Sequence, residues 1–316
     1  MAEKISTRVS YGKELCEIGS DENIFVFDAD LTICTMTCYF AEKYPKRFFN
    51  AGIAEANMIG MSAGAAATGK TVFCNSFAMF TAGRGFDQIR NSVAYPHLNV
   101  KLVGTHAGLS VGEDGATHQC IEDLSLMRTI PGMTVLCPCD DNETRAAVRA
   151  IAQYDGPCYL RLGRSAVDCV TDSIPGYQFE IGKGSMLKDG SDVTIIATGL
   201  MVQVALEAEK KLAEQGIRAR IIDMHTIKPI DRDIIIQAAK ETGAIVTAEE
   251  HNIIGGLGSA VSEVVCEECL VPVIKLGVND VFGHSGTVED LMTRYGLTAD
   301  DLIAKVKLAI SKKQNN

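Results

Sequence analysis

The chain has 316 residues, 47% hydrophobic and 22% charged, which fits a globular protein with two domain-sized cores. The formal net charge is −10 and no extended basic run is present, so nucleic acid and anionic membranes are excluded as expected partners. No apolar run approaches about 18 residues and no secretory segment follows Met1, so the eleven cysteines are expected to be free thiols in a reducing cytoplasm.

Strand and helix patterns alternate through the first half, with short loops between them. We expect helices at 7–20, 36–44, 53–69, 77–91, 120–128 and 141–154, and strands at 24–27, 47–50, 71–75, 101–105, 134–137 and 158–162. This alternation predicts an α/β domain with a mostly parallel sheet. In such sheets, polar groups gather where the strands end.

Periodicity is lost over 165–180, which we interpret as a linker, and a second α/β unit follows. We expect strands at 193–197, 218–223, 244–248 and 271–276, and helices at 200–214, 231–241, 256–268 and 298–312. The fold class is therefore two consecutive α/β domains with mostly parallel sheets. We place them at residues 1–170 and 171–316.

The first candidate site residue is Glu55, in the stretch 47–60. The pattern is a short strand, a turn at Ala51-Gly52 and a helix that begins near Ile53, which puts Glu55 in the first helical turn. Its neighbours are apolar, so we expect the carboxyl group to be largely dehydrated. The alternative is an ordinary helix-start acid without chemistry, because such positions often carry Glu.

Two phenylalanines follow in Ser76-Phe-Ala-Met-Phe80. Phe77 and Phe80 are three residues apart near the expected start of a helix and would share one face. They could be ordinary core residues, or they could form a stacking surface for a flat heteroaromatic ring.

A glycine-rich loop, Thr105 to Gln119, follows an apolar strand and carries His106, Asp114 and His118. Two histidines and an acid in such a loop favour a functional site over packing. Arg164 closes the strand at 158–162, after Gly163, and could bind an anion or remain a solvated charge.

The close cysteine pairs Cys137-Pro-Cys139 and Cys266-Glu-Glu-Cys269 were considered as a four-thiolate zinc site. Neither pair lies in the glycine-rich turn that such sites favour, so we predict packed thiols and no metal ligand in this chain.

Several motifs, in order along nearly the whole chain, resemble the transketolase family. They are Gly52-Ile-Ala-Glu55-x-Asn57, Ser76-Phe-x-x-Phe80, Phe86-Asp-Gln-Ile-Arg90, Gly112-Glu-Asp-Gly115-x-Thr-His118-Gln and Thr226-Ile-Lys-Pro-Ile230-Asp. The resemblance corresponds to the pyrimidine-binding domain followed by the C-terminal domain. The Gly-Asp-Gly…Asn motif of the family's diphosphate-binding domain is not found, because Glu113-Asp-Gly115 lacks the first glycine.

The resemblance implies a split transketolase that transfers a glycolaldehyde unit from a ketose phosphate to an aldose phosphate, in the pentose phosphate pathway. Glu55 would hydrogen-bond the aminopyrimidine of thiamine diphosphate and promote its imino tautomer, while Phe77 and Phe80 would stack on that ring. The sugar phosphate would meet His106, His118, Asp114 and Arg164, with the two histidines and Glu55 acting as catalytic residues. The position where many members place a phosphate-contacting serine is Cys34 here, which leaves the acceptor specificity open.

The resemblance also implies an assembly. The partner would be a separate N-terminal transketolase subunit that binds the diphosphate and its Mg²⁺, and two copies of each chain would form a heterotetramer. The isolated chain is expected to be a dimer. The alanine- and glycine-rich helix at 53–69 is the expected close-packing element.

Three other functions share part of this pattern. 1-Deoxyxylulose-5-phosphate synthase is similar at Gly-Ile-Ala-Glu and Asp-Gly-x-Thr-His, but the context of His106 and His118 favours transketolase. A 2-oxoacid dehydrogenase beta-type subunit would not need a sugar-reading loop with two histidines. A non-catalytic subunit that kept the fold would have no use for Glu55.

Overall fold

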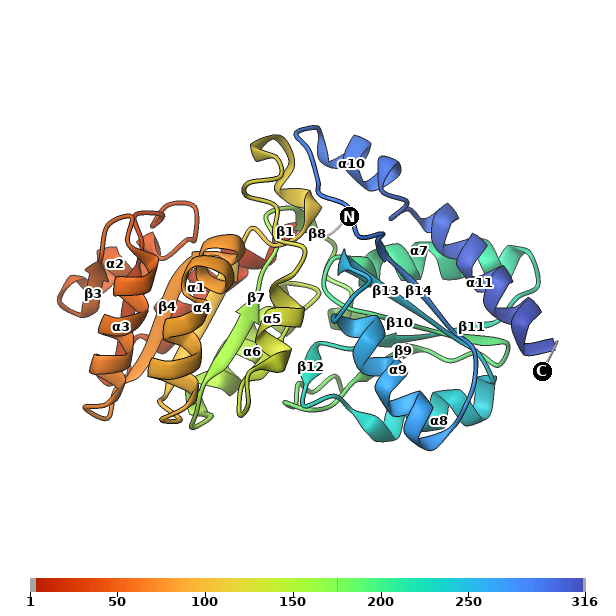
Figure 1. The fold of residues 1–316 in the computed structure, drawn as a ribbon, viewed down its shortest axis with the longest axis horizontal. Coiled ribbons are helices and arrows are strands. Elements are labelled where there is room, and N and C mark those ends of the chain that lie inside the picture. The colour runs from red at the N-terminus through yellow and green to blue at the C-terminus, as the bar shows by residue number, and fades with distance from the viewer. Residues whose placement is uncertain (1–3, 175, 315–316) are drawn as a thin grey trace.

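The computed structural model describes residues 4–174 and 176–314 and contains two α/β units that lie side by side (Figure 1). The first is built on a seven-stranded sheet and the second on a five-stranded sheet. A small antiparallel pair, β1 (Ile5–Ser6) with β8 (Ala166–Val167), joins the start of the first unit to its end. The predicted fold class is confirmed.

The first sheet has the order β12-β6-β7-β5-β4-β2-β3, and every neighbouring pair except β12 with β6 is parallel. Its own strands are β2 (Ile24–Asp28), β3 (Phe48–Asn50), β4 (Thr71–Phe77), β5 (Val100–Thr105), β6 (Thr134–Leu136) and β7 (Cys158–Arg161). Its helices are α1 (Thr7–Ile18), α2 (Cys38–Lys43), α3 (Glu55–Ala66), α4 (Phe86–Gln88), α5 (Asp123–Thr129) and α6 (Asp141–Gln153). The parallel order brings the ends of β4, β5 and β7 to one edge.

The second sheet has the order β14-β13-β10-β11-β9, with β9 antiparallel to β11 at its edge. Its strands are β9 (Ser185–Lys188), β10 (Val193–Ala197), β11 (Ala219–Asp223), β13 (Ile245–Asn252) and β14 (Val273–Val278). Its helices are α7 (Met201–Glu214), α8 (Arg232–Thr242), α9 (Leu257–Glu268), α10 (Val288–Arg294) and α11 (Ala299–Gln314).

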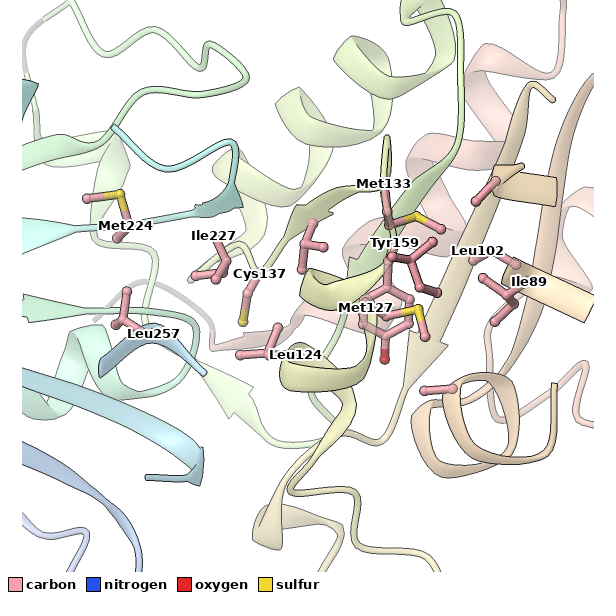
Figure 2. Close-up of a cluster of buried hydrophobic side chains, with 14 of the residues drawn as sticks. Ile89, Leu102, Leu124, Met127, Met133, Cys137, Tyr159, Met224, Ile227 and Leu257 are labelled. Atoms are coloured by element: carbon pink, nitrogen blue, oxygen red, sulfur yellow. The ribbon is translucent and has the colours of Figure 1, made fainter. Parts of the chain in front are cut away.

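The two units are joined by backbone pairing as well as by side chains. Strand β12 (Thr226–Lys228) belongs by sequence to the second unit but forms the antiparallel edge of the first sheet beside β6. The buried core also continues across the junction. Figure 2 places Leu124, Cys137, Ile227 and Leu257 in this shared cluster. Packing of this kind resembles one core more than a contact between independent domains.

Sequence reasoning placed most elements within a few residues and missed others. The expected helix at 77–91 is wrong in form, because β4 continues through Phe77. It is followed by two π-helical turns, η2 (Met79–Arg84) and η3 (Ile89–Ala94), with the short α4 between them. The pattern did not predict β9, β12 or α10. Strand β8 and a single turn of 3₁₀ helix at Thr171–Ser173 lie within the expected linker.

The eleven cysteines all lie in the described ranges and are free thiols there. No helix within residues 4–174 or 176–314 combines the length and the apolar character that are needed to cross a membrane.

Candidate functional site

Glu55 is the first helical residue of α3 and is buried, with 5% of its surface exposed. The turn before it uses Gly52, whose φ of +70° is in the left-handed region that favours glycine. Its Oε1 accepts a hydrogen bond from Arg84 Nη1 at 2.9 Å, and the Arg84 side chain is about half exposed. The expected dehydration of Glu55 is confirmed, and its pairing with Arg84 was not predicted.

Four side chains form a continuous stack beside Glu55. The Arg84 guanidinium lies over the Phe80 ring at 4.1 Å, Phe80 stacks on Phe77 at 5.7 Å between centroids, and Phe77 stacks on His106 at 3.9 Å. The His118 ring meets the edge of Phe80 at 5.2 Å. Phe77 ends a strand and Phe80 belongs to η2, so the two rings meet through a strand-to-helix corner and not through one helical face.

His106 follows β5 with a φ of +56° and is almost fully buried. Its Nδ1 lies 3.0 Å from the Thr105 hydroxyl. Burial first, and then the nearby charges of Arg8 and Arg164, lower the pKa of His106 to about 3. The imidazole is therefore neutral near pH 7, and its ring nitrogen that carries no hydrogen can accept a hydrogen bond.

His118 and Asp114 lie farther along the same loop and are less buried. The loop forms a 3₁₀ segment, η4 (Leu109–Asp114), which is kinked at Gly112, where φ is +81°. His118 Nδ1 lies 2.9 Å from the Thr117 hydroxyl, and its ring turns back toward the phenylalanines. Asp114 is exposed at the end of η4.

The loop is held from the second unit. The Glu250 carboxylate, on β13, accepts hydrogen bonds from the backbone N–H and the hydroxyl of Ser110. Gln119 Nε2 donates to the carbonyl of His284 at 3.0 Å. A Cβ on Gly108 would lie only 2.4 Å from the Glu250 carboxyl carbon, so this close approach requires glycine.

Two arginines lie near His106. Arg164 Nη1 donates to the carbonyl of Val111 and lies 3.3 Å from Glu113 Oε2. Arg8, on α1, donates from Nη1 to the carbonyl of Cys34 at 2.8 Å, and its buried Nε has no protein partner within the described residues. Burial lowers the pKa of Arg8, and the charge of Arg164 acts in the same direction. Two guanidinium groups that repel each other favour an anion between or beside them.

The structure thus brings Glu55, Phe77, Phe80, His106 and His118 into one cluster, with Arg164 near His106. Asp114 is on the same loop but in solvent. Sequence reasoning missed Arg84, Arg8 and Glu250. The sequence could have predicted Arg84, because a residue four positions after Phe80 in a helical segment lies on the same face and can stack on its ring. Nothing local marked Arg8 or Glu250.

This arrangement offers three chemical capacities along one strand edge. A buried carboxylate is paired with an arginine that lies over an aromatic ring, a neutral imidazole can accept a hydrogen bond, and two neighbouring guanidiniums can bind an anion. The first suits a flat heterocycle. The other two suit an anionic, hydroxylated substrate.

Comparisons with known proteins point to one family. Residues 3–168 match the family model described as the transketolase pyrimidine binding domain, and residues 182–302 match the transketolase C-terminal domain. A Methanocaldococcus jannaschii protein provisionally named a transketolase C-terminal section is 50% identical, over 97% of this chain and 96% of that protein.

Two further proteins are also similar over nearly all of this chain. The 6-deoxy-6-sulfo-D-fructose transketolase subunit of a Clostridium species is 46% identical over 90% of this chain and 87% of that protein. A solved structure, described as an inactive beta4 tetramer of a split-gene transketolase, superimposes with a TM-score of 0.90. It is 51% identical and covers 98% of this chain and 100% of its own.

Proposed function

The chain belongs to the transketolase family, and from this premise we propose that it is one subunit of an enzyme that is active only with a separate diphosphate-binding subunit. Together the two would transfer a two-carbon glycolaldehyde unit from a ketose phosphate to an aldose phosphate. The observation that carries the proposal is the single cluster in which Glu55, the stacked Phe77 and Phe80, and the two loop histidines meet.

The cofactor in this proposal is thiamine diphosphate, which when bound supplies a carbon nucleophile for the sugar carbonyl. The residues present fit its aminopyrimidine ring. Glu55 is buried at a helix start, and its pair with Arg84 uses Oε1, which leaves Oε2 for a ring nitrogen. Phe80 is only partly buried, so it and Phe77 would pack against a face of the ring. Glu55 would hold the proton that sets the tautomer of the ring.

The sugar in this proposal meets the loop. Neutral His106 would accept a hydrogen bond from a sugar hydroxyl, and His118, at the edge of Phe80, would hydrogen-bond a neighbouring sugar oxygen. Asp114 would accept a hydrogen bond from a hydroxyl on the exposed side. Arg164 would bind the phosphate. Arg8, which the sequence analysis did not predict, would bind the same phosphate together with Arg164.

Magnesium in this proposal is ligated by the partner subunit, because the sequence has no Gly-Asp-Gly…Asn motif for a metal-bound diphosphate. Support for a partner comes from the relatives that match this chain over nearly their whole length and are described as a C-terminal section or as a subunit.

The outer face of α3 supports a packing partner. Its inner face is buried on the sheet through Met58 and Ile59, but Gly60 and Gly64 face open space and Met61 is 41% exposed. Ile53, just before the helix, is 77% exposed. The glycines leave room for a second backbone to approach closely, and the exposed Met61 and Ile53 supply apolar surface for the contact. We propose that two copies of this chain join two copies of the partner in a closed two-fold assembly.

Reconstitution tests the function. The purified chain with thiamine diphosphate, Mg²⁺, a ketose phosphate and an aldose phosphate is expected to give no turnover. Adding a chain that carries Gly-Asp-Gly and a distal Asn, encoded beside this one, is expected to restore glycolaldehyde transfer. Turnover by this chain alone would refute the two-subunit proposal.

Two further substrates distinguish the proposed transketolase reaction from the alternative reactions. Pyruvate with an aldose phosphate tests the synthase reaction, and a sulfonated ketose tests the substrate named for the Clostridium relative. Transfer from a ketose phosphate but not from pyruvate is the expected result. Light scattering on the active mixture should give four subunits, and a fully active one-to-one heterodimer would contradict the proposed assembly.

A further inference from the structure

Three buried side chains from both units meet away from the cluster described above. Cys139 follows β6, Glu143 is in the first turn of α6, and Asp223 ends β11. The Cys139 sulfur, one carboxylate oxygen of Glu143 and one of Asp223 all lie within 4.8 Å of one another. At most 4% of the surface of any of these residues is exposed.

Asp223 is the unexplained member of this group. It is fully buried, and neither of its oxygens has a hydrogen-bond partner within the described residues. Glu143, in contrast, accepts from the Cys139 backbone N–H at 2.7 Å and from the Tyr177 hydroxyl. A buried carboxylate without a partner costs several kcal/mol, by rough estimate, unless a proton or a cation compensates it.

The surrounding charges do not supply that compensation. Asp140 is close by, but it caps α6 through the Glu143 N–H and accepts from Thr171, so it adds negative charge. No basic side chain forms an ion pair with Asp223 or Glu143 in the part of the chain that the structure describes.

We propose that Cys139, Glu143 and Asp223 bind a divalent transition-metal ion, zinc by preference, that links the two α/β units. A thiolate with two carboxylates suits zinc and excludes magnesium and calcium, which take oxygen ligands. Zinc bonds of about 2.3 Å to sulfur and about 2.1 Å to oxygen require only a modest contraction of the group. Three protein ligands leave a fourth position for water.

This ion would connect the two α/β units. Its ligands come from the loop after β6 and the first turn of α6 in the first unit, and from the end of β11 in the second. The same junction carries the β12–β6 pairing and the continuous core. The proposal is independent of the transketolase reaction, and the site is separate from the magnesium assigned to the partner.

Metal analysis of the full chain, without a polyhistidine tag, tests the proposal. Elemental analysis after dialysis should find about one zinc per chain, and Co²⁺ added to stripped protein should give a thiolate-to-cobalt charge-transfer band. Losing an outer-shell partner alone costs about 10- to 100-fold in metal affinity. Cys139→Ser and Asp223→Asn should therefore each weaken binding by at least about 100-fold.

Cys137→Ser is the matched control, because Cys137 is a buried thiol two residues away and outside the group. It should keep the metal and the cobalt band. Circular dichroism on each variant separates lost binding from lost folding, and Asp223→Asn keeps the shape of the side chain. The proposal would be overturned if neither zinc nor cobalt bound saturably, zinc left the melting temperature unchanged and Asp223→Asn raised it. That result would favour a proton shared between the two carboxyl groups.

Discussion

The cofactor end and the substrate end of the candidate site are built in different ways. Glu55, Phe77, Phe80 and Arg84 come from one stretch of 30 residues in the first unit and are linked by successive contacts, from Glu55 to Arg84, Arg84 to Phe80 and Phe80 to Phe77. The loop with His106 and His118 is instead held by partners 140 and 165 residues away, in the hydrogen bonds from Ser110 to Glu250 and from Gln119 to His284.

The second unit therefore contributes to the candidate site indirectly, by holding the loop that carries the two histidines. The first unit contains the side chains of the site, but the second positions its loop through buried contacts. Damage to the cofactor end should therefore change the chemistry and leave the fold intact. Damage to the contacts of the loop should change stability and activity together.

The largest expected effect is at the cofactor end. Glu55→Gln keeps a hydrogen bond but cannot exchange a proton. In the reconstituted complex, exchange of the thiazolium proton should fall by about two to four powers of ten, the usual range of general acid–base contributions. Cofactor affinity and the denaturation midpoint should change little. Glu22→Gln, an exposed carboxylate of the same unit, is the control, and unaffected exchange in Glu55→Gln would reduce Glu55 to a structural acid.

The next effect compares two glycines with similar backbone angles. Gly52 (φ +70°) has open space where a Cβ would be, whereas at Gly108 (φ +81°) a Cβ would meet the Glu250 carboxylate. Gly52→Ala should cost only backbone strain, about 1–2 kcal/mol. Gly108→Ala should also weaken the Ser110–Glu250 contacts, for a total of about 2–4 kcal/mol. Chemical denaturation measures both, and equal losses would mean that Glu250 does not hold the loop.

The sequence could predict the features that are adjacent in the chain but not those that depend on long-range contacts. Glu55 was found because a turn, a helix start and apolar neighbours are adjacent in the chain. The sheet order followed from strand and helix alternation only in outline, since β12 crosses to the other unit. Arg8 and Glu250 carry no local pattern, because their importance comes from long-range contacts. The approach of Cys139 to Asp223 is hidden for the same reason, because the cysteine spacing pairs Cys139 only with Cys137, and the sequence predicted packed thiols there.

A smaller effect tests the anion contacts. Charge-assisted hydrogen bonds contribute about 1.5–3 kcal/mol, so Arg164→Ala and Arg8→Ala should each raise KM for a ketose phosphate about 10- to 100-fold. The KM for an unphosphorylated ketose should rise far less in the same variants. Arg90→Ala, an exposed arginine of the same unit, should leave KM unchanged. Equal effects on both substrates would mean that the arginines support the loop and do not bind the phosphate.

The smallest expected effect is a pH dependence at the substrate end. The folded-state pKa of His106 is lowered to about 3, first by burial and then by the charges of Arg8 and Arg164, whereas an unfolded histidine has a pKa of about 6.5. Below pH 6.5 the unfolded chain therefore binds a proton that the folded chain does not, so this group makes stability fall as the pH falls from about 6.5 toward 3. Between pH 7 and about pH 5.5 its contribution should be about 1 kcal/mol. His106→Asn, whose side chain tolerates the left-handed backbone, should lose that part of the pH dependence. Denaturation of the two proteins across this range measures the difference. A difference between wild type and His106→Asn that stays constant from pH 7 to 5.5 would contradict a neutral, buried His106.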